Sequence, residues 1–143
     1  MAVRRISPDE ARKLMEDGYT YLDVRSVPEY DQGHPAGAVN APLMHMGPGG
    51  MAPNADFVAV VAAAFPKDAR LVVGCKSGMR SQKAALLLEG AGFGNLVEMR
   101  GGWAGEADPM GRVVEKGWSA QGFPSATAPT AGGSWEELRS KKG

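Results

Sequence analysis

Short apolar runs alternate along the chain with amphipathic or alanine-rich stretches. The runs have the length and composition of strands and fall at 20–24 (TYLDV), 38–42 (AVNAP), 70–75 (RLVVGC) and 95–99 (NLVEM). Helices are predicted at 7–18, at 54–65 and from the end of the polar stretch CKSGMR to Gly90 or Gly92. Strand and helix thus alternate at the spacing of βαβ units. The pattern predicts an α/β fold with a mainly parallel central sheet and helices on both faces.

Polar residues at the predicted helix ends support these limits. Ser7 and Glu10 form a capping-box pattern at the first helix, and Ser134 and Glu137 repeat it near residue 135. Asn54 is the predicted N-cap of the helix rich in alanine and valine.

Three segments lack a regular pattern. Glycine, proline and methionine dominate 43–53 (LMHMGPGGMAP), for which we expect a mobile loop. The segment 104–117 is rich in turn residues, and 125–133 has linker composition. We therefore expect one domain over 1–124, followed over 125–143 by a linker and a short, loosely tethered C-terminal helix.

Composition narrows the class of protein. Sixteen basic residues balance sixteen acidic ones, so net charge predicts neither nucleic acid nor a membrane as the main partner. One cysteine and two histidines exclude an internal disulfide and a usual Cys/His zinc site, and we expect no metal. No stretch approaches the roughly 20 apolar residues of a membrane span. We expect a cytoplasmic protein whose thiol stays reduced.

The cysteine lies where a predicted strand runs into a predicted helix. In open α/β sheets this is where ligands bind. The backbone amides from Lys76 to Ser81 can curl around one point, because Gly78 tolerates conformations that other residues resist. Together with Lys76, Arg80 and the helix start, they favour a thiolate on Cys75 over a thiol. A lone cysteine at a strand end is more often a packing residue, but these polar neighbours favour a reactive one.

Loop length indicates which anion this cradle suits. Four residues separate Cys75 from Arg80 in CKSGMR, whereas cysteine-dependent phosphatases use one residue more. The tighter ring suits a single charged sulfur, the outer atom of a cysteine persulfide. A phosphatase or an arsenate reductase is the less favoured alternative, and a non-catalytic module that docks partners through 43–53 or the tail is a third.

Three ordered motifs resemble the rhodanese family of sulfurtransferases, and its single-domain members in particular. They are DVRSVPEYDQGHPAGAVNAP (23–42), CKSGMRS (75–81) and GAGFGNLVEMRGGW (90–103). The resemblance implies a thiosulfate sulfurtransferase that needs no cofactor. In this family a sulfane sulfur passes from thiosulfate or another persulfide donor to cyanide or a thiol. A protein that donates or accepts a persulfide is a possible partner.

The same resemblance assigns the site residues. Cys75 is the catalytic residue, and the substrate or persulfide loop comprises Lys76, Ser77, Gly78, Met79, Arg80 and Ser81. Lys76 and Arg80 would attract the anionic donor, and Ser77 and Ser81 would add hydroxyl donors.

Four more residues are supporting candidates. Asp23 and Arg25 follow a strand end, and we expect a structural ion pair there. Glu29 lies four residues after Arg25 and would be its partner if the segment is helical. His34 is expected to be a hydrogen-bonded structural residue rather than a base. Pro35 stands one place earlier than in the family pattern, which leaves the local turn open.

Overall fold

The computed structural model describes residues 3–76 and 79–140. Within them, a central sheet holds five strands in the order β1-β8-β7-β2-β4, and each neighbouring pair is parallel. These strands are β1 (Arg4–Ile6), β2 (Thr20–Asp23), β4 (Val39–Asn40), β7 (Arg70–Gly74) and β8 (Asn95–Met99). The predicted parallel sheet is confirmed.

The remaining elements are helices and short strands around that sheet. The helices are α1 (Pro8–Glu16), α2 (Val27–Gln32), α3 (Phe57–Ala64), α4 (Met79–Gly90), α5 (Trp135–Ser140) and the 3-10 helix η1 (Trp118–Gln121). The short strands are β3 (His34–Pro35), β5 (Met44–Gly47), β6 (Gly50–Pro53), β9 (Glu106–Ala107), β10 (Val113–Glu115) and β11 (Ser125–Ala126).

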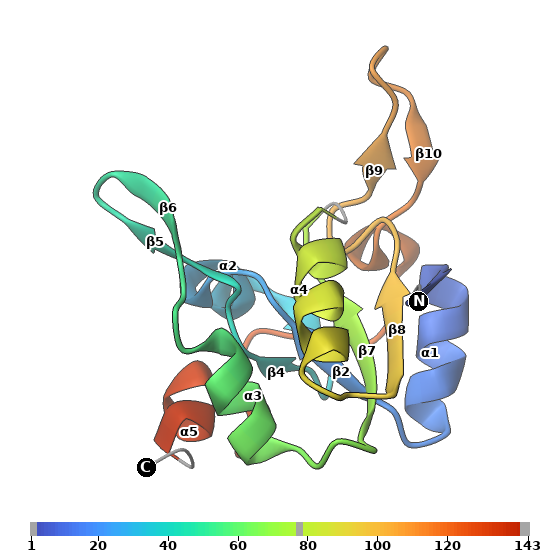
Figure 1. The fold of residues 1–143 in the computed structure, drawn as a ribbon. Coiled ribbons are helices and arrows are strands. Elements are labelled where there is room, and N and C mark those ends of the chain that lie inside the picture. Colours follow the sequence, from blue (N-terminus) through green and yellow to red (C-terminus); the bar gives the residue numbers. More distant parts are fainter. Residues whose placement is uncertain (1–2, 77–78, 141–143) are drawn as a thin grey trace.

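Alternate residues of the strands pack into two separate hydrophobic cores, one on each face of the sheet. Leu71 and Val73 face one way and pack with α3, α4 and α5, whereas Val72 between them faces α1 and Trp118. This period of two is what a strand covered on both faces requires. Figure 1 shows α4 in front of the sheet and α1 to the right of β8, and α1 packs in the second core rather than in that of α3 and α4. Helices on both faces are therefore confirmed.

The segment 43–53 is not the irregular loop that its composition predicts. Strands β5 and β6 pair antiparallel from Met44–Pro53 to Gly47–Gly50 and form a hairpin. Gly50 has a φ of +101°, a conformation that glycine adopts without strain and that closes the turn. A second hairpin, β9–β10, occupies most of the segment 104–117. Both hairpins project from the body of the protein (Figure 1).

The tail is also more firmly packed than predicted. Trp135 and Leu138 of α5 are buried in the core on the α3 side of the sheet. The carbonyl of Gly133 accepts a hydrogen bond of 2.7 Å from the backbone N–H of Asn40, in edge strand β4. The Ser134–Glu137 capping box is present as predicted. The expectation of a loosely tethered helix is wrong, because its two large apolar side chains complete the core.

Other differences are local. Helix α3 begins at Phe57 with Asp56 as its N-cap, so the predicted cap at Asn54 is wrong. The Asn54 side chain instead accepts a hydrogen bond from the backbone N–H of Asp56 and donates one to the carbonyl of Pro42. Strand β1 and helix α2 were not predicted. In the described ranges no helix is long and apolar enough to cross a membrane.

Candidate active site

Cys75 follows strand β7 directly and is 1% exposed. The residue before it, Gly74, lies against the hydroxyl of Tyr21 on neighbouring β2, so closely that a Cβ at 74 would overlap that oxygen. Burial, the largest effect, raises the pKa of Tyr21 well above 10, and Asp23 adds to it. The cysteine therefore leaves the sheet from a backbone packed on a neutral phenol.

The segment after β8 holds the start of the loop. The backbone N–H of Trp103 donates to the carbonyl of Cys75 at 2.7 Å, and that of Ala104 donates to the carbonyl of Lys76 at 2.9 Å. A Cβ on Gly102 would overlap the Cys75 carbonyl oxygen and lie 2.7 Å from the carbonyl of Lys76. The GGW motif is thus a backbone clamp on the cysteine loop.

The thiol contacts a chain of buried polar groups. Its Sγ lies 3.4 Å from the hydroxyl of Ser81, in the first turn of α4. That hydroxyl donates a very short hydrogen bond to Oε2 of Glu98, and Oε1 of Glu98 accepts one of 2.5 Å from Nε of Arg5. Glu98 and Arg5 were not predicted. The sequence signal that could have indicated Glu98 is its position two residues after Leu96 in the run NLVEM, which puts a charged residue on the same strand face as a buried leucine.

Arg80 is paired with Glu29 and not free to face an incoming anion. Its two terminal nitrogens donate to the two carboxylate oxygens of Glu29 at 2.7 and 3.0 Å. Burial would raise the pKa of Glu29, but hydrogen bonds from Arg80 and Ser26 outweigh it and lower that pKa from 4.5 to about 2. The same hydrogen bond raises the pKa of Arg80. The expected pairing of Glu29 with Arg25 is wrong, because α2 points Glu29 toward α4.

Asp23 and Arg25 form a buried pair next to the site. Nη2 of Arg25 lies 2.7 Å from Oδ2 of Asp23 and also donates to the carbonyl of Gly33 at 2.6 Å. The guanidinium lies 5.2 Å from the ring centre of Trp103, in cation–π geometry. Burial tends to lower the pKa of Arg25, but the Asp23 hydrogen bond and charge raise it overall. The pair ties the α2 loop to the GGW clamp.

His34 is fully buried beneath helix α2. Its Nδ1 lies 2.7 Å from the carbonyl oxygen of Tyr30, and its ring stacks on the Tyr30 ring at 3.7 Å. These contacts fit a residue that fixes the turn after α2, where β3 pairs with β11.

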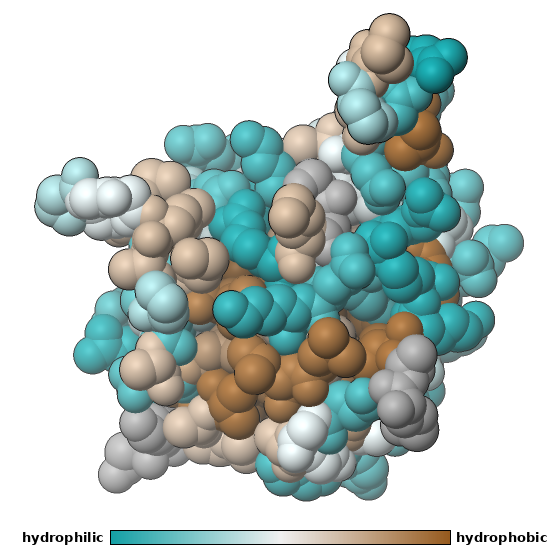
Figure 2. Space-filling view, turned by 45° about the horizontal axis from the view of Figure 1, so that its top comes forward, coloured by the Kyte–Doolittle hydropathy of each residue, from teal (hydrophilic) through white to brown (hydrophobic). Residues whose placement is uncertain are grey.

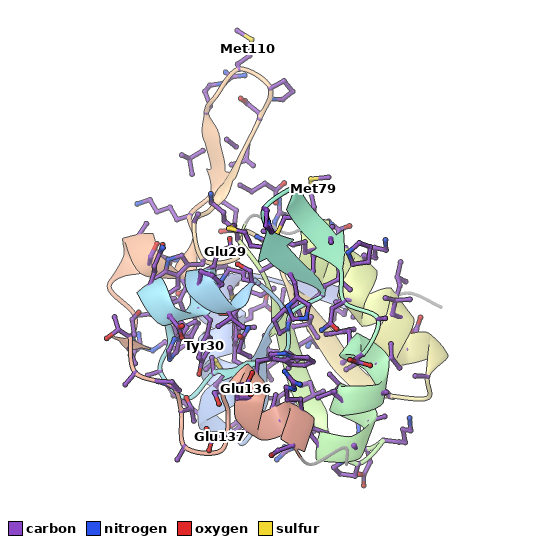
Figure 3. The ribbon with its side chains drawn as sticks, turned by 90° about the vertical axis from the view of Figure 1, so that its left-hand side faces the viewer. Glu29, Tyr30, Met79, Met110, Glu136 and Glu137 are labelled. Carbon is purple, nitrogen blue, oxygen red and sulfur yellow. The ribbon has the colours of Figure 1, made fainter. Side chains whose placement is uncertain are left out.

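Part of the predicted cradle lies outside the described residues. These positions are Ser77 and Gly78, so the ring of amides from Lys76 to Ser81 stays a prediction. Lys76 is exposed and Met79 is 80% exposed. Met79 is the first residue of α4, and Figure 3 shows Met110 at the tip of the β9–β10 hairpin. The two hairpins stand out on either side of this end of α4 (Figures 1 and 2).

This arrangement defines a class of protein. A buried cysteine at the carboxyl end of a parallel strand faces a helix start and is held by a backbone clamp. Arg80, in the first turn of that helix, is already paired with a carboxylate. These features suit a nucleophilic sulfur that handles a small ligand.

Comparison with known proteins identifies the family. The family model of the rhodanese-like domain matches residues 7–106. The chain is 37% identical over 120 residues to thiosulfate sulfurtransferase 16, chloroplastic, of Arabidopsis thaliana. The matched region covers 84% of this chain and 90% of that protein. Thiosulfate sulfurtransferase 18 of the same plant is 34% identical over 116 residues, with 78% and 85% covered. The chain therefore belongs to the rhodanese-like family.

Solved structures agree. The crystal structure of Rv0390 from M. tuberculosis superposes with a TM-score of 0.74 at 25% identity and covers 90% of this chain and all of that one. The rhodanese-like fold predicted from the sequence is confirmed.

Proposed function

We propose that the protein is a thiosulfate sulfurtransferase that works through a persulfide on Cys75. In the first step the Cys75 thiolate attacks the outer sulfur of thiosulfate, the sulfur–sulfur bond of the donor breaks, and sulfite leaves with the bonding electrons. In the second step cyanide or a thiolate attacks the outer sulfur of the persulfide. Thiocyanate or a new persulfide leaves, and the Cys75 thiolate is restored.

The structural observation that most strongly supports sulfur over phosphate is the Arg80–Glu29 pair. A phosphate-binding loop uses its arginine fork to hold two phosphoryl oxygens. In this protein both terminal nitrogens of that fork are bound by one carboxylate. The short loop points the same way. A phosphatase or arsenate reductase would have to break a partly buried ion pair before it bound its substrate.

The first experiment is mass spectrometry of the intact protein after incubation with thiosulfate. Because the chain has one cysteine, a thiol-bound sulfur can form only at Cys75. We expect a mass increase of one sulfur atom that dithiothreitol removes and that is absent in Cys75→Ser. Thiocyanate should then form on addition of cyanide. A wild-type protein that gains no sulfur from thiosulfate and yields no thiocyanate would refute the proposal.

The alternatives give different results in the same set of assays. Hydrolysis of p-nitrophenyl phosphate or reduction of arsenate, lost in Cys75→Ser, would favour phosphate-like chemistry. No reaction in any assay would favour a module that only docks partners. A reducing compartment such as the cytoplasm would keep Cys75 free in either case.

A protein persulfide is the second donor class that we propose. Six large apolar side chains are exposed on the two hairpins and at the outer end of α4, namely Met46, Met51, Met79, Met110, Val113 and Val114. Methionine-rich surfaces adapt to varied partners. A donor panel that compares thiosulfate with a persulfidated protein tests this, and Met110→Ser should weaken only transfer from the protein donor.

A further inference from the structure

Glu98 is a buried carboxylate one side chain away from the reactive sulfur. The line of contacts runs from Sγ of Cys75 to the hydroxyl of Ser81, on to Oε2 of Glu98, and from Oε1 of Glu98 to Nε of Arg5. Cys75 and Glu98 are each 1% exposed, and Ser81 is fully buried. The line joins the loop after β7 to α4, β8 and β1.

The proton positions along this line follow from the chemistry of its ends. Glu98 pairs with the Arg5 guanidinium at 2.5 Å, and both side chains line a surface pocket of about 150 Å³. A carboxylate that is paired with a guanidinium only accepts hydrogen bonds. A serine hydroxyl has one hydrogen, so Ser81 gives it to Glu98 and turns oxygen lone pairs toward Sγ. The thiol of Cys75 then donates to Ser81.

Two forms of the sulfur do not fit this arrangement. A thiolate has no hydrogen to donate, and neither has the inner sulfur of a persulfide. Each would face the Ser81 lone pairs unless the hydroxyl hydrogen turned from Glu98 to Sγ. Rotation of the Ser81 hydroxyl would remove a hydrogen bond from the buried carboxylate of Glu98, and the loss of that bond is unfavourable.

We propose that Glu98 is a positioning residue that acts through Ser81 to favour the thiol of Cys75 over its thiolate and its persulfide. The effect of Glu98 on sulfur transfer rests on the proposed sulfurtransferase function, whereas its effect on the thiol does not. The Cys75 thiolate is the nucleophile in loading and the leaving group in delivery, so by disfavouring it Glu98 would slow both steps.

Other charged or titratable groups around Cys75 do not provide this contact. They are Tyr21 and Asp23 of β2, Arg25 just after it, Glu29 of α2, Lys76 of the loop and Arg80 of α4. Asp23 and Arg25 neutralise each other, as do Glu29 and Arg80. Tyr21 is neutral, and Lys76 is exposed. Glu98 is the acid that hydrogen-bonds the partner of the thiol.

The test is the pH dependence of iodoacetamide alkylation of Cys75, which needs no sulfur donor. In Glu98→Gln the amide donates to Ser81, whose hydrogen is then free to turn to the thiolate. We expect the pH midpoint of alkylation to fall by about one to two units, the size of a hydrogen bond to a charged group. Glu106→Gln is the matched control, because Glu106 also lies near Arg5, at 4.0 Å. It should leave the midpoint unchanged.

A second pair of variants separates hydrogen bonding from simple charge. In a Ser81→Ala background, Glu98→Gln should shift the midpoint much less than it does alone. An equal shift in both backgrounds would mean that Glu98 acts as a charge through space, and the proposal would fail. If Glu98→Gln does not fold, Ser81→Ala alone tests the proposal. A rise of the alkylation midpoint in Ser81→Ala would equally refute it.

Single-turnover kinetics then test the consequence. Glu98→Gln should both load sulfur from thiosulfate and deliver it to cyanide faster than the wild type. Slower loading together with slower delivery would overturn this part. If the wild type takes up no sulfur at all, the proposed function fails, but the alkylation result still decides the role of Glu98.

Discussion

Arg80 donates two hydrogen bonds to Glu29, one from each terminal nitrogen to a different carboxylate oxygen, at 2.7 and 3.0 Å. The two residues are 51 positions apart in the sequence, and each side chain is 18% exposed. The pair joins α2 to the first turn of α4 and so sets both the charge and the position of the helix that begins beside Cys75.

This pair predicts how stability depends on pH. The pKa of Glu29 in the folded protein is about 2, below its ordinary value of 4.5. The unfolded chain therefore takes up the proton at the higher pH. The stabilisation is complete above pH 4.5 and is lost as the pH falls toward 2. Glu29→Gln should reduce the free energy of unfolding at pH 7 by about 1–2 kcal/mol.

Urea denaturation at pH 7, 4 and 3 measures this effect. The gap between wild type and Glu29→Gln should narrow steadily as the pH falls. Glu16→Gln is the control, because Glu16 is 67% exposed in an i,i+4 pair and should change little at any pH. A gap that stayed constant from pH 7 to pH 3 would contradict the pKa assignment.

The same pair predicts a change in substrate affinity. With Glu29→Gln the Arg80 charge is no longer neutralised, so a doubly charged anion should bind the loop more tightly. We expect the KM for thiosulfate to fall about threefold or more at low salt, with less change at high ionic strength. Inhibition by inorganic phosphate should strengthen in parallel. An unchanged KM together with unchanged phosphate inhibition would show that Arg80 does not face the donor.

The clamp behind the loop predicts a selective loss of activity. Gly102 has a φ of +54°, and a Cβ there would overlap the Cys75 carbonyl oxygen. Gly102→Ala should displace the loop and lower kcat/KM by about a hundredfold, the effect of an error near 1 Å at a reacting group. Gly122 has a similar φ of +70° and nothing within 4 Å of an added Cβ.

Gly122→Ala is therefore the matched control for backbone strain. Both variants should lose about 1 kcal/mol of stability from the left-handed conformation. Thiocyanate production at thiosulfate concentrations well below KM distinguishes them, since only the change at Gly102 should affect it. Equal activities in the two variants would mean that the clamp does not control the position of Cys75.

The packed tail predicts that removal of residues 125–143 does more than detach an accessory segment. Leu138 is 1% exposed in the main core, whereas Leu87 on α4 is 42% exposed. Leu138→Ala should cost about 2–4 kcal/mol because it leaves a cavity, and Leu87→Ala should cost less than about 0.5 kcal/mol. Thermal melting of the two variants measures the difference. Equal melting temperatures would show that the C-terminal helix contributes little to the stability of the core.

Local pattern predicted much of the fold, and the exceptions have physical causes. The run NLVEM gives β8 with its predicted limits, because a strand buried on both faces must be apolar throughout most of its length. Strand β1 has the sequence RRI, which carries no such signal and is a strand only because β8 lies beside it. The glycine-rich segment 43–53 forms a hairpin for a similar reason, since pairing between its halves supplies what side-chain propensity does not.

The site divides in the same way. Cys75 could be proposed from the sequence as the reactive residue because its polar and basic neighbours are consecutive in the chain. The pairings of Glu29 with Arg80 and of Ser81 with Glu98 were not, since they depend on which strands neighbour one another in the finished sheet. Glu29 illustrates the difference. Spacing along a helix favoured Arg25 as its partner, but Arg25 was already taken by Asp23.

The contact between Gly133 and edge strand β4 has a consequence for the protein while it is being made. Strand β4 lies at the end of the sheet, and its Asn40 N–H is bonded to the carbonyl of Gly133. The strand leaves the ribosome long before that carbonyl does, and an uncovered edge is a template for pairing with another chain. At ~5–20 residues per second the delay is on the order of seconds. The rate of synthesis, rather than the stability of the finished domain, then sets how long nascent chains are exposed to one another.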